Sequence, residues 1–573
     1  MKEEIKKFFK GDLEDGEETL EKYSHDASLF TVRPKLVAYP KDGEDVKNLV
    51  KWVNKTRTNA DFTRTGAEKI SITARSAGTD MTGGPLNESI ILDFTRYMNK
   101  LVSFPCQGDT LTGAITVQPG MYYRDFEKIV SEKGLMLPSY PASKSICAMG
   151  GMYANNAGGE KTLKYGKTED YVMSSKIVLA DGEEYFVRPQ MITDFKRINT
   201  DKTKSFLDKV SNEIYKLITD NLQLITKSRP KVSKNSAGYY IWNVISEPRE
   251  EIIPSEVEGF KKRVEGYFDL NKLFVGSQGT LGIVTEITFR LVPIPENTRL
   301  AVIFLDDLNK ISNLVNEILK YKPESLEAYD DKTLKIAMKF FTSFLKGKGI
   351  WGSLKFAWSF WPDLFLLIRY GFPKLVLLTE LSGDEKEIKI KYNNLAKYLK
   401  SLNINSRLST SKYDTEKYWE IRHESFNLLR KHVKGKKTAP FIDDVIVRPE
   451  FLPEFLPELE EILSKYPELE HTIAGHPGDG NFHIIPLVDI SDPRLKKDVL
   501  EVSEKVYDLV LKYGGSITAE HNDGIIRTPY LEKMYGPKMI EIFKKIKNIF
   551  DPQNIFNPGK KVSGTREDIA KYL

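Results

Sequence analysis

Two histidines of this chain stand seven residues apart, in a segment that can fold back on itself. His476 and His483 enclose the sequence Pro-Gly-Asp-Gly-Asn-Phe. Gly478 and Gly480 break a regular helix and permit a sharp turn, so the two imidazoles can converge from a loop and from the strand predicted after it. Two neutral imidazoles suit Zn²⁺, and also Mn²⁺, Fe²⁺ or Co²⁺. From this segment alone, structural or surface histidines are the alternative.

A metal held by two histidines needs further ligands, and a second segment offers a carboxylate. In the sequence Ser-Ile-Thr-Ala-Glu-His-Asn-Asp-Gly, Glu520 stands directly before His521. Imidazole nitrogens with one carboxylate form a common ligand set for a catalytic divalent ion that keeps open positions. Glu520 is therefore the candidate third ligand.

Three other stretches are rich in small residues that let backbone approach a ligand. Residues 75–84, RSAGTDMTGG, follow a predicted strand, and their N–H groups can form a nest for a diphosphate. Residues 137–172 and 275–286 are also rich in Gly, Ala, Ser and Asn, which suits backbone lying against a large flat ligand. No G-x-G-x-x-G fingerprint follows an early strand, which argues against a Rossmann site. For the first stretch alone, a tight turn without a ligand is the alternative.

The elements that position these residues follow two patterns. Residues 33–56 predict a strand and then a helix, and residues 170–187 predict a hairpin around Asp181 and Gly182. After about residue 297, strands alternate with amphipathic helices, which suits a sheet covered on one face by helices. Together these patterns predict an α+β fold. The predicted helix within residues 33–56 has one apolar face, made of Val46, Leu49, Val50 and Val53.

Composition limits the class of protein. A chain of 573 residues is too long for one ordinary core, so two or more domains are expected. Cys106 and Cys147 are the only cysteines, which excludes a disulfide framework and an internal four-cysteine iron–sulfur cluster. The N-terminal sequence is charged and lacks the apolar core of a signal peptide. A reducing, cytoplasmic location is expected.

The excess of basic residues is concentrated in one aromatic insert, residues 332–378. It contains eight Lys or Arg against Asp363, while the whole chain has a net charge of +5. A nucleic-acid binder would spread such residues over a domain face, so no nucleic-acid partner is expected. Trp351, Trp358 and Trp361 among basic residues suit an interfacial helix on anionic lipid, at the inner face of the membrane. A core helix or a partner-docking surface are the alternatives.

The order of several motifs resembles a known family. RSAGTDMTGG, GGMYANNAGG, YGKTEDYV, GSQGTLGIVTE, HPGDGNFH and FNPGK occur in sequence between residues 23 and 561. Together they resemble FAD-linked oxidases of the vanillyl-alcohol oxidase type, with the PCMH-type flavin fold, and within them the glycolate oxidase D-subunit and D-lactate dehydrogenase group. The resemblance implies an FAD-binding domain at residues 1–296 and 528–573. Residues 297–527 would form a cap domain with an antiparallel sheet, which includes the insert.

The resemblance also implies which residues hold the cofactor. FAD would bind noncovalently, because the first glycine-rich turn contains no histidine for covalent attachment. One group would line the pyrophosphate, a second the flavin and ribityl chain, and a third the adenine half, with one residue closing over the isoalloxazine. In that order, the groups are Arg75, Ser76, Ala77, Gly78, Thr79, Asp80, Thr82 and Gly83; Pro141, Ala142, Ser143, Gly150, Gly151, Asn155 and Gly158; Ile283 and Val284; and Asn557.

The family implies a dehydrogenase of D-2-hydroxy acids, with D-lactate as the expected substrate. His476, His483 and Glu520 would bind the metal, with zinc first and manganese or iron as alternatives. His521 would take the substrate hydroxyl proton as general base. Arg422, in the W-x-x-R position, would hold the substrate carboxylate through its guanidinium. Secondary candidates for substrate contacts are Lys437 and Asp444.

Two positions depart from the family pattern. Many relatives have Asn two residues after the second histidine, where this chain has Ile485. Many have Gly-Glu-His-Gly, where this chain has Ala519-Glu520-His521-Asn522. The metal ligands and the base are preserved, but the contacts that select one 2-hydroxy acid cannot be carried over.

With no second cofactor expected in the chain, the electron acceptor would be a quinone or a separate iron–sulfur or electron-transfer protein. Two other functions are compatible with the fold. One is a non-redox transferase of the alkylglycerone-phosphate synthase type, against which the absence of a triple-histidine run argues. The other is a flavin electron-transfer subunit of a membrane complex. Reduction of bound flavin by a 2-hydroxy acid would distinguish them.

Overall fold

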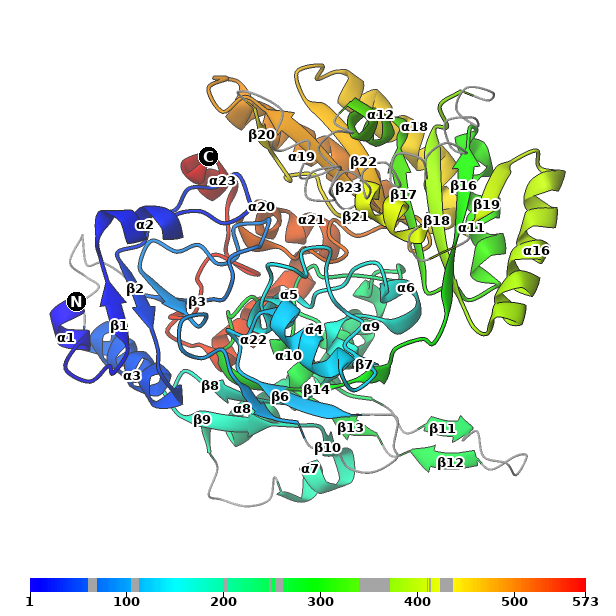
Figure 1. The fold of residues 1–573 in the computed structure, drawn as a ribbon. Helices are drawn as coiled ribbons and strands as arrows, with labels where there is room; N and C mark the ends of the chain where they lie inside the picture. The colour runs from blue at the N-terminus through cyan, green and yellow to red at the C-terminus, as the bar shows by residue number, and fades with distance from the viewer. Residues whose placement is uncertain are drawn as a thin grey trace.

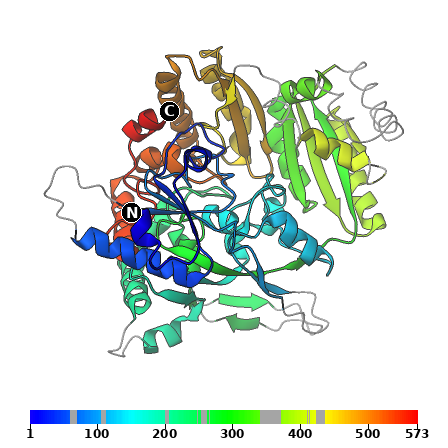
Figure 2. The ribbon, with the colours of Figure 1, turned by 60° about the vertical axis from the view of Figure 1, so that its left-hand side comes forward.

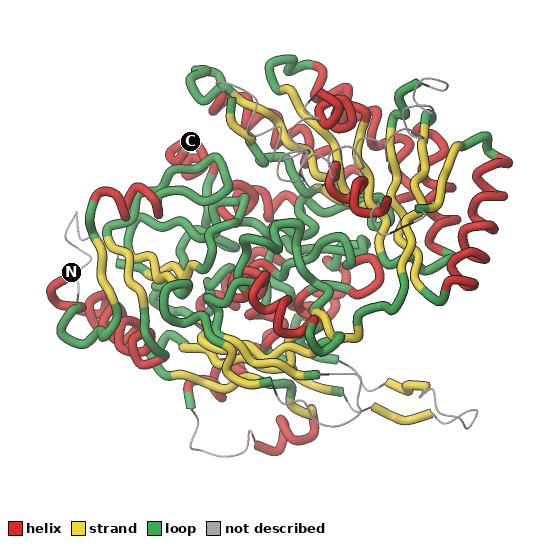
Figure 3. The backbone as a smooth tube through the Cα atoms, viewed as in Figure 1, coloured by secondary structure: helices red, strands yellow, loops and turns green. Residues whose placement is uncertain are grey.

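The computed structural model of the chain describes residues 1–59, 70–104, 113–198, 205–246, 249–252, 261–264, 266–339, 371–409, 411, 414–422 and 436–573. These residues form two layered parts that lie side by side (Figure 1). The first part contains a four-stranded and a five-stranded sheet, and the second contains an eight-stranded sheet. Strands and helices are mixed in both parts (Figure 3), which confirms the predicted α+β class.

The four-stranded sheet is largely parallel and carries the first glycine-rich stretch. Its strands are β1 (Asp12–Glu14), β2 (Leu36–Tyr39), β4 (Ile90–Asp93) and β3 (Ile72–Arg75), in that spatial order. Helix α3 (Gly43–Asn59) packs against it with four fully buried apolar side chains, which confirms the predicted face. The glycine-rich stretch begins at the end of β3, so this sheet positions it.

The five-stranded sheet is antiparallel, in the order β5 (Leu101–Ser103), β6 (Ala114–Val117), β14 (Ile283–Arg290), β8 (Val172–Val178) and β9 (Glu184–Val187). Strands β8 and β9 form the predicted hairpin, with Gly182 at φ +78° in its turn. Helices α5 (Met149–Asn155) and α10 (Asn271–Phe274) lie above this sheet in Figure 1. The second and third glycine-rich stretches therefore meet over one face of the sheet.

The C-terminal segment returns to the first part of the molecule. Helix α22 (Pro537–Phe550) packs against α8 (Phe206–Asp220), and helix α23 (Arg566–Tyr572) lies near α2 (Glu17–Tyr23) in Figure 1. The backbone N–H of Asn557 donates to the carbonyl of Ile72, 2.9 Å away. The chain ends are thus joined to the same sheets that surround the glycine-rich stretches.

The eight-stranded sheet is antiparallel. Its main path is β19 (Asn405–Leu408), β16 (Thr298–Leu305), β18 (Leu375–Ser382), β17 (Ser325–Asp330), β22 (Glu470–His476), β23 (Asn481–Val488) and β20 (Lys437–Thr438), and β21 (Val445–Ile446) also pairs with β23. Helices α11 (Ile311–Leu319), α16 (Glu385–Ser401), α18 (Leu452–Ser464) and α19 (Leu495–Lys512) accompany these strands (Figure 2). This confirms the predicted antiparallel sheet covered by helices.

The opposite face of this sheet is covered as well. Leu300, Val302 and Tyr329 are buried there against Leu334 of α12 (Asp331–Lys339) and Ile421 of the segment 414–422. Because both faces are buried, the central strands are apolar at consecutive positions instead of alternating. Glu327 lies two residues from Tyr329 on the same strand, so its side chain points to the same face of the sheet as Tyr329. The histidine pair lies on this face.

Among the described residues, no helix has both the length and the apolar character needed to cross a membrane. Most of the aromatic insert, including Trp351, Trp358 and Trp361, lies outside the residues that the structure describes.

Candidate active site

A pocket opens where the three glycine-rich stretches meet. Its walls are the loop after β3, helix α5 with the residue before it, and the turn at 277–282 before β14. At Gly151 no atom lies within 4 Å of the place a Cβ would occupy, so bare backbone faces open space. Gly78 and Gly279 have φ of +67°, which favours glycine. The predicted cofactor residues that line the pocket are Arg75, Ser76, Ala77, Gly78, Thr79, Asp80, Gly150, Gly151, Asn155 and Val284.

Other residues predicted for the cofactor lie outside this lining. Asn557 is buried behind it, where its Oδ1 accepts from the Thr73 hydroxyl at 2.9 Å. Its Nδ2 donates to the carbonyls of Gly84 and Gln278, at 2.9 and 2.7 Å. Asn557 therefore ties the first and third stretches together from behind. The remaining residues outside the lining are Thr82, Gly83, Pro141, Ala142, Ser143, Gly158 and Ile283.

Asp80 and Gln278 connect the walls of the pocket. Asp80 Oδ1 accepts from the backbone N–H groups of Thr82 and Gly84, at 2.7 and 3.1 Å, and its Oδ2 accepts from the Asn155 amide at 2.7 Å. Gln278, at φ +52°, donates to Asn155 Oδ1 at 3.3 Å. Sequence reasoning did not single out Gln278, although its place between Ser and Gly in the third stretch was an available signal.

The histidine pair lies at a tight connection between two strands. His476 ends β22, His483 lies on β23, and residues 477–480 join them. A Cβ at Gly480, whose φ is +76°, would lie 1.8 Å from the carbonyl oxygen of Val447, so only glycine fits there. The two Nε2 atoms are 3.2 Å apart and the ring planes are nearly perpendicular, at 87°. The turn thus brings together the two imidazoles, as the glycines predicted.

Glu520 completes a donor set at this point. Its Oε2 lies 3.6 Å from His476 Nε2. Ring nitrogens 3.2 Å apart match two neighbouring ligands of one ion bound at about 2.0–2.1 Å. The other carboxylate oxygen of Glu520 accepts from Lys234 Nζ at 2.6 Å, and Lys234 also lies 3.0 Å from Asp479 Oδ2. The three residues fit a divalent cation, and Lys234 holds the carboxylate in place.

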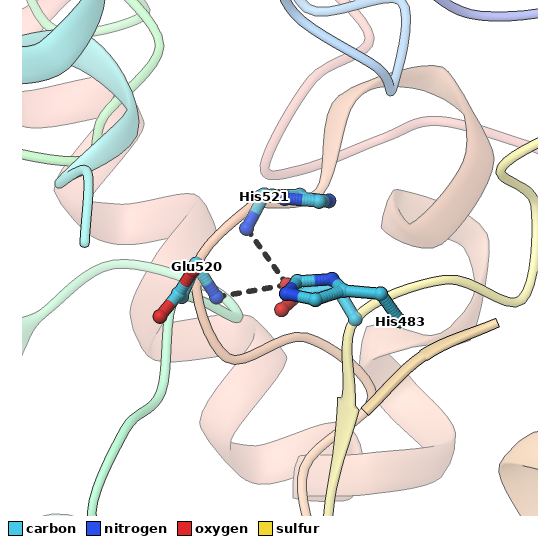
Figure 4. A group of neighbouring side chains, drawn as sticks. His483, Glu520 and His521 are labelled. Carbon is cyan, nitrogen blue, oxygen red and sulfur yellow. Dashed lines mark hydrogen bonds between the residues drawn. The ribbon is translucent and has the colours of Figure 1, made fainter. Parts of the chain in front are cut away.

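Asp444 shapes the turn that carries Glu520 and His521. Its Oδ2 accepts from the Thr518 hydroxyl at 2.7 Å and from the backbone N–H groups of Ala519, Glu520 and His521, at 2.9, 2.8 and 2.7 Å. Figure 4 shows Glu520 and His521 on this turn, with His521 next to His483. Asp444, His483, Glu520 and His521 have ligand atoms within 4.8 Å of one another. Hydrogen-bond donors already occupy the Asp444 carboxylate. His476 is therefore a better third metal ligand than Asp444, beside His483 and Glu520.

Carboxylates stand behind all three histidines. His476 Nδ1 contacts Glu327 Oε1, His483 Nδ1 lies 3.1 Å from Asp443 Oδ1, and His521 Nδ1 lies 2.7 Å from Asp443 Oδ2. Burial lowers the pKa of His476, but the Glu327 carboxylate outweighs it and the pKa rises to about 9. Burial likewise lowers the pKa of His521, but Asp444 and Asp443 raise it to about 9.

Arg422 reaches the same cluster from the segment 414–422. Its Nη2 lies 3.3 Å from Glu327 Oε2. Glu327 therefore links the predicted substrate-orienting arginine to the predicted metal ligand His476. Lys437, in contrast, is exposed on β20, which pairs with the far end of β23. Sequence reasoning missed Glu327 because no local motif marks a carboxylate 149 residues from its histidine partner.

Hydrogen bonds connect the histidine cluster directly to the residues around the pocket. Asn522 Nδ2 donates to the carbonyl of Gly276 at 2.8 Å and to that of Asn155 at 3.3 Å. A Cβ at Gly158 would lie 3.3 Å from Glu520 Oε1. The Glu520–His521 turn therefore rests on two of the glycine-rich stretches, so a flat ligand in the pocket would end beside the histidines.

Comparison with protein families identifies two regions of the chain. Residues 34–187 match the family model described as "FAD binding domain". Residues 294–561 match "FAD linked oxidases, C-terminal domain". The chain belongs to the FAD-linked oxidases. FAD is therefore the cofactor of this family, and the match to the FAD-binding domain spans the first two glycine-rich stretches that line the pocket.

Curated relatives of this FAD-linked oxidase have different substrates in their names. "D-2-hydroxyglutarate dehydrogenase" of Escherichia coli (strain K12) is 25% identical over 94% of this chain, which spans about half of that relative's length (49%). "Glycolate oxidase subunit GlcD" of Bacillus subtilis (strain 168) is 26% identical, with 94% and 91% coverage. "D-lactate dehydrogenase" of Archaeoglobus fulgidus is 28% identical, with 94% and 96% coverage.

Solved structures share the fold of this oxidase. A 4-ethylphenol oxidase from Gulosibacter chungangensis matches 96% of this chain and 94% of its own, with a TM-score of 0.63 at 14% identity. An alkyldihydroxyacetonephosphate synthase matches 97% of this chain and 84% of its own, with a TM-score of 0.62 at 15% identity. At these identities the likeness establishes the PCMH-type fold alone.

One departure from the family pattern has a physical explanation in the structure. Asn522 occupies the position where many relatives have glycine, and its φ is +72°. Asparagine tolerates this left-handed conformation better than most side chains. Its amide adds the bonds to Gly276 and Asn155, so the substitution keeps the turn and fastens it to the pocket. Ile485 lies on β23 opposite Thr472, and nothing in the structure explains that substitution.

Proposed function

We propose that this FAD-linked oxidase is a dehydrogenase that oxidises a D-2-hydroxy acid to the 2-oxo acid, with D-lactate as the first substrate to test. The observation that carries the proposal is the position of His476, His483, Glu520 and His521. The turn that bears Glu520 and His521 is bonded directly to two walls of the flavin pocket. A 2-hydroxy acid held there has its C2 beside the end of the pocket.

The division of the chain into two domains is supported by contacts of its C-terminal segment. We infer an FAD-binding domain of residues 1–296 and 528–573 and a cap of residues 297–527. The return of α22 and Asn557 to the first sheets supports this division. The cap then contributes Arg422, His476, His483 and the 518–522 turn to a site at the boundary.

The cofactor set in this proposal is noncovalent FAD and a divalent metal, with zinc first and manganese or iron as alternatives. When bound, FAD accepts the hydride, and the cation lowers the pKa of the substrate hydroxyl. His476, His483 and Glu520 would hold the ion. The donor set supports this, because His476 Nε2 lies 3.2 Å from His483 Nε2 and 3.6 Å from Glu520 Oε2.

Two side chains would act on the substrate itself. Arg422 offers a planar guanidinium that binds a carboxylate bidentately and sets the direction of C2. His521 would accept the hydroxyl proton on its Nε2 while its Nδ1 faces Asp443. The product then carries a ketone at C2, and the electron pair has left with the hydride.

The names of the relatives support a common substrate group rather than one acid. Glycolate, D-lactate and D-2-hydroxyglutarate all carry a hydroxyl on the carbon next to a carboxylate, and they differ only in the substituent on that carbon. D-lactate has the smallest substituent that makes C2 chiral, so it tests reactivity and handedness together. For the reduced flavin we propose a quinone or an iron–sulfur or electron-transfer protein as acceptor, with peripheral membrane contact through the insert.

Anaerobic mixing of the FAD-loaded, zinc-loaded enzyme with D-lactate, glycolate and D-2-hydroxyglutarate tests the proposal. We expect the flavin absorbance to bleach with at least one acid, and L-lactate to serve as the matched control of handedness. The His476→Ala, His483→Ala double variant should retain FAD and stay oxidised. An enzyme with full FAD and zinc that no 2-hydroxy acid reduces would contradict the proposal and favour a transferase or electron-transfer subunit.

A further inference from the structure

Asp443 lies between two histidines of the site and contacts both. The residue is completely buried, on the loop between β20 and β21. Its Oδ1 is 3.1 Å from His483 Nδ1, and its Oδ2 is 2.7 Å from His521 Nδ1. The two rings are stacked, with centroids 5.0 Å apart and planes at 20°. One carboxylate is thus shared by a proposed metal ligand and the proposed base.

The contact between Asp443 and His521 joins two buried atoms that are close together but poorly aligned. His521 Nδ1 and Asp443 Oδ2 are 2.7 Å apart but off the line of a regular hydrogen bond, and neither has another hydrogen-bond partner. An unsatisfied buried donor or acceptor costs about 1–3 kcal/mol. A small rotation of the ring would remove this cost for both atoms, so the pair is expected to form the bond.

Asp443 is held firmly in its place. Arg527, fully buried, donates from Nη2 to the Asp443 carbonyl oxygen and from Nη1 to the Asn522 carbonyl oxygen at 3.0 Å. Both carboxylate oxygens of Asp443 face a ring nitrogen that can donate a hydrogen bond, which favours the ionised form of the carboxyl group. Asp443 is therefore a carboxylate anion whose backbone is held by Arg527.

The proton positions follow from the chemistry of a carboxylate. An ionised carboxylate only accepts hydrogen bonds, so each facing Nδ1 must carry a hydrogen. A neutral imidazole with its hydrogen on Nδ1 has its lone pair on Nε2. For His483 that lone pair points to the Nε2 of His476, where the metal would bind. For His521 it is the lone pair that a general base requires.

We propose that Asp443 is a positioning residue that sets the Nδ1–H tautomer of His483 and His521 at once, and so orients the metal ligand and the active-site histidine together. This inference rests on the proposed function for His521, but its consequence for His483 does not. Glu327 stands behind His476 in the same way, yet it serves only that one histidine. Asp443 is thus the carboxylate on which the metal ligand and the base both depend.

Asp443→Asn tests the proposal because an amide has one acceptor and one donor. The amide oxygen of the Asp443→Asn variant can accept from one histidine and keep it in the Nδ1–H form. The amide NH₂ group donates, so the other histidine cannot keep a hydrogen on its Nδ1. Either the zinc Kd rises by about 10–100-fold, or flavin reduction at saturating zinc slows by about 10²–10⁴-fold. Asp443→Ala removes both acceptors, and both losses should appear together.

Asp330→Asn is the matched control. Asp330 is also a buried carboxylate that accepts from two donors, the backbone N–H groups of Thr333 and Ile473 at 2.8 and 3.0 Å. It should lose stability without any change in zinc Kd or in flavin reduction at saturating zinc. A folded, FAD-bound Asp443→Ala protein with wild-type zinc affinity and a wild-type rate of flavin reduction would overturn the proposal.

A measurement on the unaltered enzyme does not depend on how the variants fold. With labelled histidines, of which the chain has seven, NMR of the zinc-loaded holoenzyme should show the Nδ1–H tautomer at His483 and, when neutral, at His521. An Nε2–H signal at His521 would overturn the shared role. If no 2-hydroxy acid reduces the wild-type flavin, the proposed function fails, while the zinc Kd of Asp443→Ala still tests the effect on His483.

Discussion

The flavin pocket and the histidine cluster are built on opposite principles. The pocket is lined mainly by residues of three glycine-rich stretches, each continuous in sequence. The cluster is made of side chains that are spread along the sequence between residues 234 and 521. Their buried charges compensate each other. Backbone contacts tolerate exchange of most side chains, whereas a buried charge network fails when one member is lost. The two regions should therefore respond differently to single substitutions.

The largest effect is expected from loss of the convergent histidines. The His476→Ala, His483→Ala double variant should lose bound metal and flavin reduction to below detection, while FAD stays bound because its pocket is separate. Metal analysis and the flavin spectrum of the purified protein measure both. Full metal occupancy in this variant would show that other residues hold the ion.

His521 separates proton transfer from metal binding within the cluster. His521→Gln should slow flavin reduction by about 10²–10⁴-fold, because a general base is lost. Metal content and FAD content should match those of the wild type, since the ligands and the pocket are unchanged. Stopped-flow reduction under anaerobic conditions gives the rate. Reduction at the wild-type rate would mean that another group takes the proton.

Lys234 tests how far the cluster depends on charge balance. Its ammonium is buried between Glu520 and Asp479, so Lys234→Met leaves two buried carboxylates without their cation. Breaking such a buried pair costs about 3–5 kcal/mol in the free energy of unfolding. Urea denaturation of the metal-free protein measures it, and added zinc should restore part of the loss.

A surface pair provides the control for Lys234. Lys505 lies 2.6 Å from Glu501, one helical turn away, and their side chains are 43% and 40% exposed. Lys505→Met should change the free energy of unfolding by less than about 1 kcal/mol. If both methionine variants lose the same stability, burial of the charges is not the reason for the effect.

Gly151 tests the pocket in the opposite way. Gly151→Val should fold, because no atom lies within 4 Å of the added Cβ, but its side chain would occupy space that FAD needs. Overpacking of about 1–3 kcal/mol would weaken FAD binding roughly tenfold or more. Zinc affinity should not change. Gly16→Val is the control, since that glycine also faces open space, outside the pocket lining. Unchanged FAD affinity in Gly151→Val would place the cofactor elsewhere.

Periodicity and local turn chemistry were sufficient for several elements. The four apolar residues of α3 repeat with the period of a helix, and all are fully buried. The Asp181-Gly182 hairpin and the turn between His476 and His483 were predicted from glycines that permit positive φ. Among the predicted cofactor residues, those of the first stretch line the pocket almost continuously, because a turn after a strand is a local structure.

Other features required the tertiary structure. The strands of the eight-stranded sheet are apolar on both faces, and that pattern does not reveal that α12 and residues 414–422 cover the second face. Ile283 and Asn557 stand in recognisable motifs, yet Ile283 lies within a sheet and Asn557 ties two loops from behind. Side-chain direction decides such cases, and residue type alone does not predict it.

By itself, the sequence determined the fold class, the flavin motifs and the convergence of His476 with His483, because each depends on residues close together in the chain. Only the tertiary structure decided that Glu327 stands behind His476, that Lys234 compensates Glu520, and that Asp443 serves two histidines. These contacts join strands and loops distant in sequence. A buried charge is stable only beside its partner, and the partner is selected by packing rather than by spacing.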